Sequence, residues 1–289
     1  MSDFKKNKEF YALINLLDEP DNNIFDQIQK KIITYGIDVL PLLKEVKDNT
    51  FNNLSRSRLK NIIHLIQYED IINNLKKWKF SSSQNLLSAY ILISKYEYPD
   101  INDDEIKVQI NNITKDIWIE SNDNYNAWQK IKILNYVLYD RYFFKGDKEN
   151  FYSTDNLFIN KVLENKKGNA VSLGLLYIII AQILDLPVYG VNLPKHFILA
   201  YISKTEKDNA FHKNIMFYIN PFYNGAIFTQ KEINLFFKQI NYKVDTSSYQ
   251  AYSNVMLIKR LIHNLVLAYN RIGENDKARE IKHFLKALE

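Results

Sequence analysis

The sequence predicts an α+β protein that is mostly α-helical, and three patterns along its 289 residues lead to this prediction. Apolar residues recur at helical spacing through most of the first half of the chain. Three short segments after residue 185 are rich in β-branched and aromatic residues and are bounded by turn residues, as strands are. Helical spacing returns near the end, so we expect helices on either side of a small antiparallel sheet.

Residues 10–80 are expected to form helices packed as hairpins. Breakers and capping residues at 18–21, Gly36 and Pro41 separate apolar stretches with helical spacing, and the alternation continues through residues 59–75. The pattern resembles a degenerate HEAT-type repeat. An ordinary helical bundle explains it equally well, because two units do not establish a period.

Residues 81–150 are expected to stay helical. Ser81 to Ser83 are interpreted as the cap of a helix that runs through Leu86, Leu87, Tyr90 and Ile91. Two further helices are expected over residues 103–118 and 125–142, with no long linker between them.

The pattern changes after Asn150. A helix that begins near Asn169 is apolar nearly all round as far as Leu184, so it should be buried at the centre of the protein. The strands expected next lie at residues 186–193, 196–201 and 215–219. The last part, residues 255–285, reads as two helices joined by a turn at Gly273, resembling one tetratricopeptide-type hairpin.

Composition excludes several classes of protein. The chain has no cysteine, which rules out disulfides, cysteine-ligated zinc and a cysteine nucleophile. Its formal net charge is +5, but the basic residues occur in scattered pairs, so a nucleic-acid partner is not expected. No stretch is long and apolar enough for a membrane span, and no signal peptide precedes the first helix, so we expect a cytoplasmic protein with no membrane contact.

Known cofactor and nucleotide motifs are missing from the sequence. There is no phosphate-binding loop, dinucleotide-binding glycine motif or nucleophile elbow, and the five histidines have no metal-ligand spacing. We therefore expect no cofactor and no metal. One arrangement does point to chemistry, because a helix begins after Asn169, a strand begins near His196 and another ends at Asn220. Cysteine proteases and transglutaminases place a nucleophile, a base and an orienting residue at three such positions.

The segment from Phe151 to Thr229, and more loosely the whole chain, resembles the bacterial transglutaminase-like proteins of the SirB type. The matching residues form an ordered set: Asn156, Leu163, Lys167-Gly168-Asn169-Ala170-Val171-Ser172-Leu173, Leu186-Pro187-Val188-Tyr189-Gly190-Val191-Asn192-Leu193-Pro194-Lys195-His196-Phe197, Asn220-Pro221-Phe222 and Gly225. The resemblance implies a helical region at 1–125, a papain-like core at 126–245 and a tetratricopeptide-like hairpin at 246–289.

Carried over residue by residue, the resemblance puts the nucleophile at Ala170, the base at His196 and the orienting residue at Asn220. Asparagine at the third position is tolerable, because papain-like enzymes use it to hold the histidine tautomer. Alanine at the first position is not, since a methyl group cannot form a thioester. Ser172 is expected to cap or pack the helix start, because its position on the helix points away from His196.

The leading hypothesis is a non-catalytic transglutaminase-like protein, a pseudoenzyme that binds a protein or peptide partner, with Asn169, His196 and Asn220 as ligand-binding residues. The alternative is a hydrolase or acyl transferase that uses His196 and Asn220 without a cysteine. A third hypothesis is a purely structural scaffold. A buried His196 that only joins two strands also stays open, and so does a cleft-lining role for the aromatic residues otherwise assigned to the core: Phe197, Tyr218, Phe222 and Tyr223.

Overall fold

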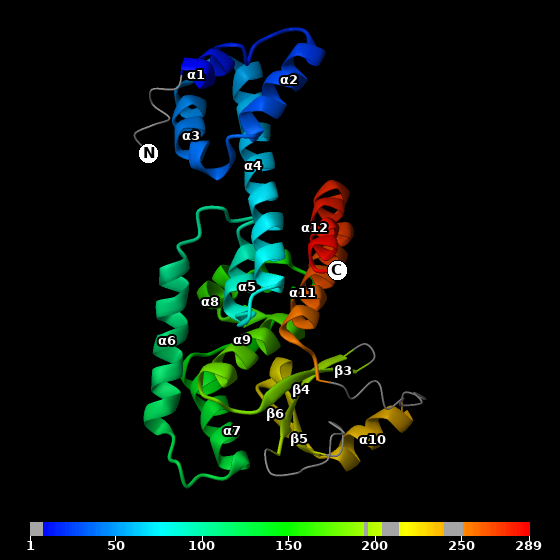
Figure 1. Ribbon diagram of the computed structural model, residues 1–289. Coiled ribbons are helices and arrows are strands. Elements are labelled where there is room, and N and C mark those ends of the chain that lie inside the picture. The colour runs from blue at the N-terminus through cyan, green and yellow to red at the C-terminus, as the bar shows by residue number, and fades with distance from the viewer. Residues whose placement is uncertain (1–7, 194–195, 204–213, 240–250) are drawn as a thin grey trace. The chain divides into compact units, whose positions relative to one another are not determined.

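The structure is a computed structural model, and it describes residues 8–193, 196–203, 214–239 and 251–289 (Figure 1). The described chain is a mostly helical α+β protein, as predicted. It divides into two compact units, Met1–Lys77 and Trp78–Glu289, which are described separately below. The three regions predicted at residues 1–125, 126–245 and 246–289 stay a prediction.

The described part of the first unit, residues 8–77, contains helices and no strand. Their bounds are α1 (Lys8–Asn15), α2 (Asn22–Ile33), η2 (Gly36–Val39), α3 (Leu40–Asn49) and α4 (Asn53–Lys79), the last of which continues into the second unit. Asp21 caps α2 as predicted, since its side chain accepts a hydrogen bond from the N–H of Asn23 at 2.8 Å. The alternation expected through residues 59–75 is wrong: they belong to one helix, because no glycine or proline interrupts it. The HEAT-type repeat stays a prediction.

The second unit opens with helices that agree with the predicted ranges. They are α5 (Leu86–Ser94), α6 (Asp103–Glu120), α7 (Ala127–Asn135) and the π-helical η3 (Tyr136–Arg141). The predicted cap of α5 is wrong, because Asn85 and not the serine run at 81–83 caps it. The Asn85 side chain accepts from the N–H of Ser88 at 2.9 Å. Gln84 has a positive φ of 38°, so the chain turns after the serines and the helix starts later than expected.

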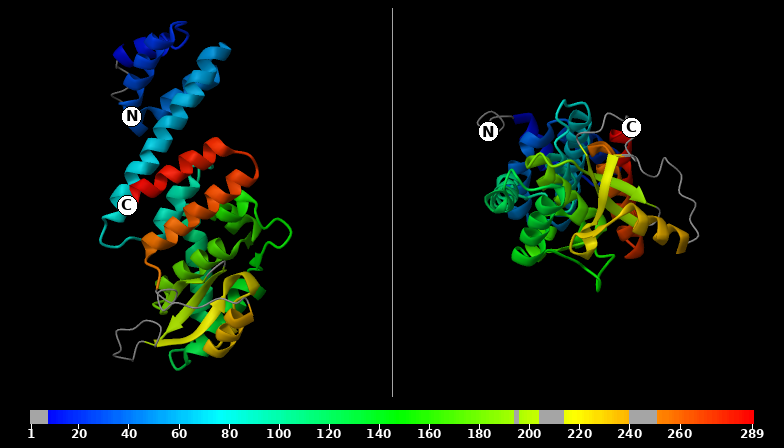
Figure 2. Two further views of the ribbon diagram at one scale, coloured as in Figure 1. Left: turned by 90° about the vertical axis from the view of Figure 1, so that its right-hand side faces the viewer. Right: turned by 90° about the horizontal axis from the view of Figure 1, so that it is seen from below.

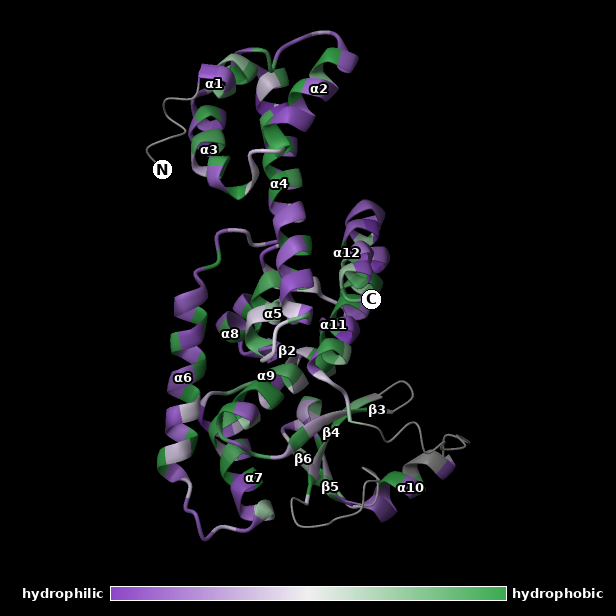
Figure 3. Ribbon diagram, viewed as in Figure 1, coloured by the Kyte–Doolittle hydropathy of each residue, from purple (hydrophilic) through white to green (hydrophobic). Residues whose placement is uncertain are grey.

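A four-stranded antiparallel sheet and one buried helix form the centre of this unit. The strands lie in the order β3 (Val188–Leu193), β4 (His196–Ile202), β5 (Ile215–Asn220) and β6 (Ala226–Phe228). The three predicted strands are confirmed, and the three-residue β6 was too short to predict. Helix α9 (Ala170–Ile183) is apolar along its length, as Figure 3 shows, and it packs against β3 and β4.

The two faces of the sheet contact different helices. Leu199 of β4 faces α9, whereas its neighbour Ile198 belongs to a cluster with Ile233 of α10 (Gln230–Gln239). This alternation is the period of two that a strand imposes on its side chains. The remaining short elements are β1 (Lys145–Gly146), η4 (Thr154–Leu157), α8 (Ile159–Asn165), β2 (Lys167–Gly168) and η6 (Pro221–Tyr223).

The last two helices form the expected antiparallel hairpin. Helix α11 (Asn254–Arg271) turns at Gly273, whose φ is +81°, into α12 (Asn275–Ala287). The left view of Figure 2 shows the two helices side by side, and α11 also packs against α5 and α9. The tetratricopeptide-like character of the hairpin stays a prediction. None of the described helices has the length and apolar character needed to cross a bilayer.

Candidate functional site

The start of α9 is a capped helix end. The side chain of Asn169 accepts hydrogen bonds from the N–H groups of Val171 at 2.9 Å and Ser172 at 3.0 Å. Ser172 Oγ in turn accepts from the Asn169 N–H at 2.9 Å, which completes a capping box. Ser172 is fully buried, so its predicted capping role is confirmed. Ala170, the first helical residue, is half-buried.

Asn169 should contribute to stability through this cap. Replacing it by alanine leaves two buried N–H donors without their acceptor, and we expect the free energy of unfolding to fall by about 1–2 kcal/mol. Urea unfolding monitored by circular dichroism measures the change. The control is Asn102→Ala, which removes the exposed cap of α6 and should lower the free energy of unfolding by a smaller amount. An unchanged midpoint for Asn169→Ala would contradict the capping role.

The start of β4 lies beside the start of α9. His196 is the first residue of β4, and its side chain lies outside the part of the chain that the structure describes. The next residue, Phe197, has its ring so close to Gly174 that a β-carbon on Gly174 would collide with it. Gly174 lies one helical turn after Ala170, so two of the predicted site segments come together in the backbone.

Asn220 ends β5 and caps the short helix η6 that follows. Its Oδ1 accepts hydrogen bonds from the N–H groups of Phe222 at 3.1 Å and Tyr223 at 3.4 Å. Both lone pairs of this oxygen are therefore used within the turn. Any other partner of Asn220 would meet its amide nitrogen, which is a hydrogen-bond donor. The ligand-binding roles predicted for Asn169, His196 and Asn220 stay predictions.

A single side chain ties the η6 turn to the helices. Asn135, the last residue of α7, donates from Nδ2 to the Gly225 carbonyl at 2.8 Å and accepts at Oδ1 from the Tyr177 hydroxyl of α9 at 2.8 Å. Gly225 has a φ of +67°, and a β-carbon there would collide with the Asn135 amide, so this position requires glycine. Asn135 thus fixes the distance between α9 and the turn that Asn220 caps.

A repeated Lys-Gly-Asx sequence forms two short paired strands next to the start of α9. Strands β1 and β2 pair in parallel with Lys145 opposite Lys167 and Gly146 opposite Gly168. The residues that follow the glycines are Asp147 and Asn169. Sequence analysis missed Asp147, although the recurrence of Lys-Gly-Asx was a signal that could have found it.

Asp147 is a buried carboxylate held by two donors. Its Oδ1 accepts from the N–H of Asn150 at 3.1 Å and its Oδ2 from the Asn156 amide at 3.2 Å. Burial acts to raise the pKa of Asp147, but these hydrogen bonds and the charge of Lys167 together lower the pKa below its ordinary value. Asn156, one of the residues in the predicted motif, is therefore a structural partner of this carboxylate.

Asp147→Asn is expected to lower the free energy of unfolding by about 1–3 kcal/mol, because one amide donor would then face another donor. The native carboxylate has a lower pKa folded than unfolded, so its contribution is complete above about pH 4 and is lost as the pH falls below that value. Unfolding curves at several pH values should thus show a shallower acid dependence for the variant. If the free energies of unfolding of the variant and the wild type fall in parallel as the pH is lowered, the stabilising role of the Asp147 carboxylate is contradicted.

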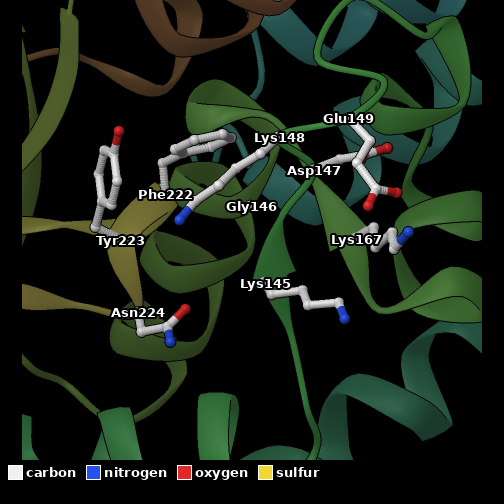
Figure 4. Close-up of a pocket in the computed structure, with 9 residues that line it drawn as sticks. All are labelled: Lys145, Gly146, Asp147, Lys148, Glu149, Lys167, Phe222, Tyr223 and Asn224. Atoms are coloured by element: carbon white, nitrogen blue, oxygen red, sulfur yellow. The ribbon is translucent and has the colours of Figure 1, made fainter.

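A pocket of about 420 Å³ opens between β1, β2 and η6. Figure 4 shows Lys148, Phe222 and Tyr223 on one side of it, and Lys145, Lys167 and the carboxylates of Asp147 and Glu149 on the other. Phe222 is buried, as are Phe197 and Tyr218, which confirms their expected core positions; Tyr223 is 56% exposed and lines the pocket. Among the described residues, no group of three or more His, Cys, Asp or Glu side chains is placed to hold a metal ion.

Comparison with known proteins identifies relatives in animals and bacteria. The chain is 28% identical to F-box only protein 21 of Homo sapiens over 238 residues, which cover 74% of this chain and 37% of that protein. It is 28% identical to a UPF0162 protein of Xylella fastidiosa (strain Temecula1) over 115 residues, covering 39% of this chain and 41% of the relative. A UPF0162 protein of Buchnera aphidicola is 29% identical over 167 residues, or 58% of each chain.

These alignments cover only part of each relative's length, between 37% and 58% in the three named. No solved structure matches the chain. A family model of the transglutaminase-like superfamily matches residues 104–263, which include α6 to α9, the whole four-stranded sheet and the first part of α11. More than half of the sequence is thus accounted for, and the chain belongs to the transglutaminase-like superfamily.

Proposed function

We propose that this protein is a non-catalytic, SirB-type member of the superfamily that binds a peptide or protein segment at a degenerate active site. The observation that carries the proposal is Ala170 at the first position of α9, where the resemblance expects the nucleophile. An intact capping box surrounds this methyl group, which supports a site that keeps its frame while the reacting atom is missing. We further propose a cytoplasmic location.

The cap at Asn220 supports the same proposal. A catalytic imidazole needs an acceptor that holds one ring N–H, so that the other nitrogen is free to take a proton. Asn220 Oδ1 already accepts from two backbone N–H groups, so an imidazole placed beside this amide would meet its N–H₂ group. A neutral imidazole carries one proton, so a ring nitrogen that accepts this hydrogen bond leaves the proton on the other nitrogen. That other nitrogen is the one that would act as the base, and it cannot take up a proton while it already carries one.

The relatives support a binding module. The region similar to F-box only protein 21 occupies 37% of that protein, so it occurs there as one portion of a longer chain. The helical region at 1–125 and the hairpin at 246–289 are proposed to add contact surface for the same partner, as stacked helical repeats do in other proteins.

The test is retention of peptides by a variant with a blocked site. We expect the purified protein, immobilised on a resin, to retain a subset of a defined peptide mixture, and Ala170→Trp to reduce that retention at least about tenfold, as loss of a central contact does. The matched control is Ala127→Trp. Ala127 also begins a helix behind an asparagine capping box and is also half-buried, but it lies at the start of α7.

Two results would overturn the proposal. Retention that is lost equally in the Ala127→Trp control, or unaffected by Ala170→Trp, would place binding elsewhere. Hydrolysis or amine coupling of any peptide by the wild-type protein, abolished by His196→Ala without loss of fold, would favour the alternative, a hydrolase or acyl transferase that uses His196 and Asn220 on a water molecule or a substrate group.

A further inference from the structure

Four aromatic rings form a continuous row that starts in the pocket. Tyr223 contacts Phe222, Phe222 contacts Phe151 and Phe151 contacts Tyr152, with ring centroids 5.4, 5.5 and 4.9 Å apart. Phe222 is buried, but Tyr223, Phe151 and Tyr152 are 56%, 40% and 50% exposed. The row therefore presents apolar surface to solvent that nothing in the described chain covers.

A cation lies over the ring at each end of the row. Lys148 Nζ is 5.2 Å from the centre of the Tyr223 ring, and the Arg271 guanidinium carbon is 3.4 Å from the centre of the Tyr152 ring. These cation–π contacts hold two positive charges beside the exposed rings. Both side chains belong to exposed residues, so their charges remain open to a ligand.

The pocket adds two more cations in an unfavourable arrangement. Lys145 and Lys167 occupy paired positions on adjacent strands, where like charges destabilise the pairing. Asp147 offsets part of this charge near Lys167, but both of its oxygens already accept hydrogen bonds within the protein. Glu149 is the other carboxylate of this pocket, and Asp155 lines the adjacent cavity together with Lys167. Four cations thus stand against three carboxylates, and an anionic group from outside would relieve the remaining repulsion.

We propose that these residues form one basic aromatic surface, defined as Lys145, Lys148, Lys167, Arg271 and the exposed rings of Phe151 and Tyr223, which binds an acidic peptide segment. Glutamate or aspartate side chains of the peptide meet the cations, and its apolar residues lie on the rings. The inference rests on the proposed function for the class of ligand, a peptide. It adds the charge of the peptide and a second contact surface that extends the proposed site from Lys167, three residues before Ala170, toward η6.

The ring geometry favours a peptide over a single-stranded nucleic acid. Bases stack on open ring faces, but the neighbouring rings in this row meet edge to face, at interplanar angles of 80°, 75° and 82°. Tyr223 and Tyr152 also each have a cation over one face. The carboxylates of Asp147 and Glu149 would repel a continuous phosphate chain, whereas a peptide brings separate charges that can avoid them.

The experiment is fluorescence anisotropy with the full-length protein and four labelled probes of equal length. They are a peptide of glutamate, proline and leucine, the same peptide with glutamine for glutamate, the same with lysine for glutamate, and oligothymidine. We expect the acidic peptide to bind at least about tenfold more tightly than the other three, and its affinity to fall as salt is added.

Variants locate the binding. The double variant Lys148→Gln with Tyr223→Ala should bind the acidic peptide at least about tenfold more weakly than the wild type does. The matched control is Lys79→Gln with Phe80→Ala, because Lys79 Nζ lies 4.9 Å from the Phe80 ring centre and Phe80 is 81% exposed, away from this surface. The control pair should bind the peptide as the wild type does.

Each other outcome overturns the inference in a recognisable way. Equal binding of the glutamine peptide removes the charge argument but leaves peptide binding, and with it the proposed function, intact. An acidic peptide that binds both double variants equally is bound elsewhere. Tighter binding of oligothymidine contradicts the choice of a peptide ligand for this surface, whereas the proposed function is still decided by the retention of peptides in Ala170→Trp. If no probe binds while the peptide mixture is still retained, only the basic aromatic surface is wrong.

Discussion

A thiol introduced by Ala170→Cys is expected to react with iodoacetamide at pH 6 about tenfold faster when Asn220→Asp is present than when the native Asn220 is kept. An aspartate at 220 can cap η6 with one oxygen and offer the other to an imidazole N–H, which asparagine does not do because its single oxygen is used in the turn. The proposed site then regains an oriented base, and the pKa of the thiol falls.

The absence of native cysteine makes the labelling unambiguous. Ala127→Cys, with and without Asn220→Asp, is the control, because its thiol begins a helix behind the same kind of cap and experiences the same helix dipole. We expect Ala170→Cys alone to react within about threefold of Ala127→Cys, since both thiols then have only the dipole to lower their pKa. A single variant that already reacts tenfold faster would contradict the explanation based on Asn220.

Gly174→Leu is expected to lower the free energy of unfolding by about 3 kcal/mol or more, the largest stability effect among these predictions. The Phe197 ring, which is 3% exposed, already occupies the place of a β-carbon at Gly174, and Leu199 lies behind it. The ring cannot move aside within a packed core, so α9 must shift away from the start of β4. The expected gain in helix propensity, about 1 kcal/mol, is too small to compensate.

Thermal and urea unfolding measure this change. Asn112→Leu at an exposed position of α6 is the control and should change the free energy of unfolding by no more than about 0.5 kcal/mol. The free energy of unfolding of Gly174→Ala should lie between those of Gly174→Leu and Asn112→Leu. Wild-type stability in Gly174→Leu would show that α9 does not meet β4 in the way described, and the placement of the site segments would have to be revised.

Strong periodicity made the centre of the protein predictable. The segment that becomes α9 is apolar on every side, a pattern that only a buried helix satisfies, and it forms that helix within one residue of the expected end. The strands β3, β4 and β5 could be predicted because β-branched and aromatic residues cluster between turn residues.

The features that were missed depend on contacts distant in sequence. Strands β1 and β2 contain two residues each, too few for a periodicity, and only the recurrence of Lys-Gly-Asx marks them in the sequence. They form because Lys145-Gly146 pairs with Lys167-Gly168 in space. The burial of Asp147 and the aromatic row through Phe151 and Phe222 likewise join separate segments. The prediction of a missing nucleophile at Ala170 needed only the family resemblance, but the use of the Asn220 oxygen within η6 became visible only in the structure.

The most direct test of the central claim is the mass of a peptide that the wild-type protein has bound. A peptide retained by the immobilised protein is incubated overnight with an excess of a primary amine and then eluted. Mass spectrometry compares its mass with that of the same peptide from an untreated sample. Binding without chemistry predicts that the mass is unchanged. Loss of ammonia with addition of the amine, or cleavage of the peptide, would show that the site reacts without a cysteine and would contradict the account.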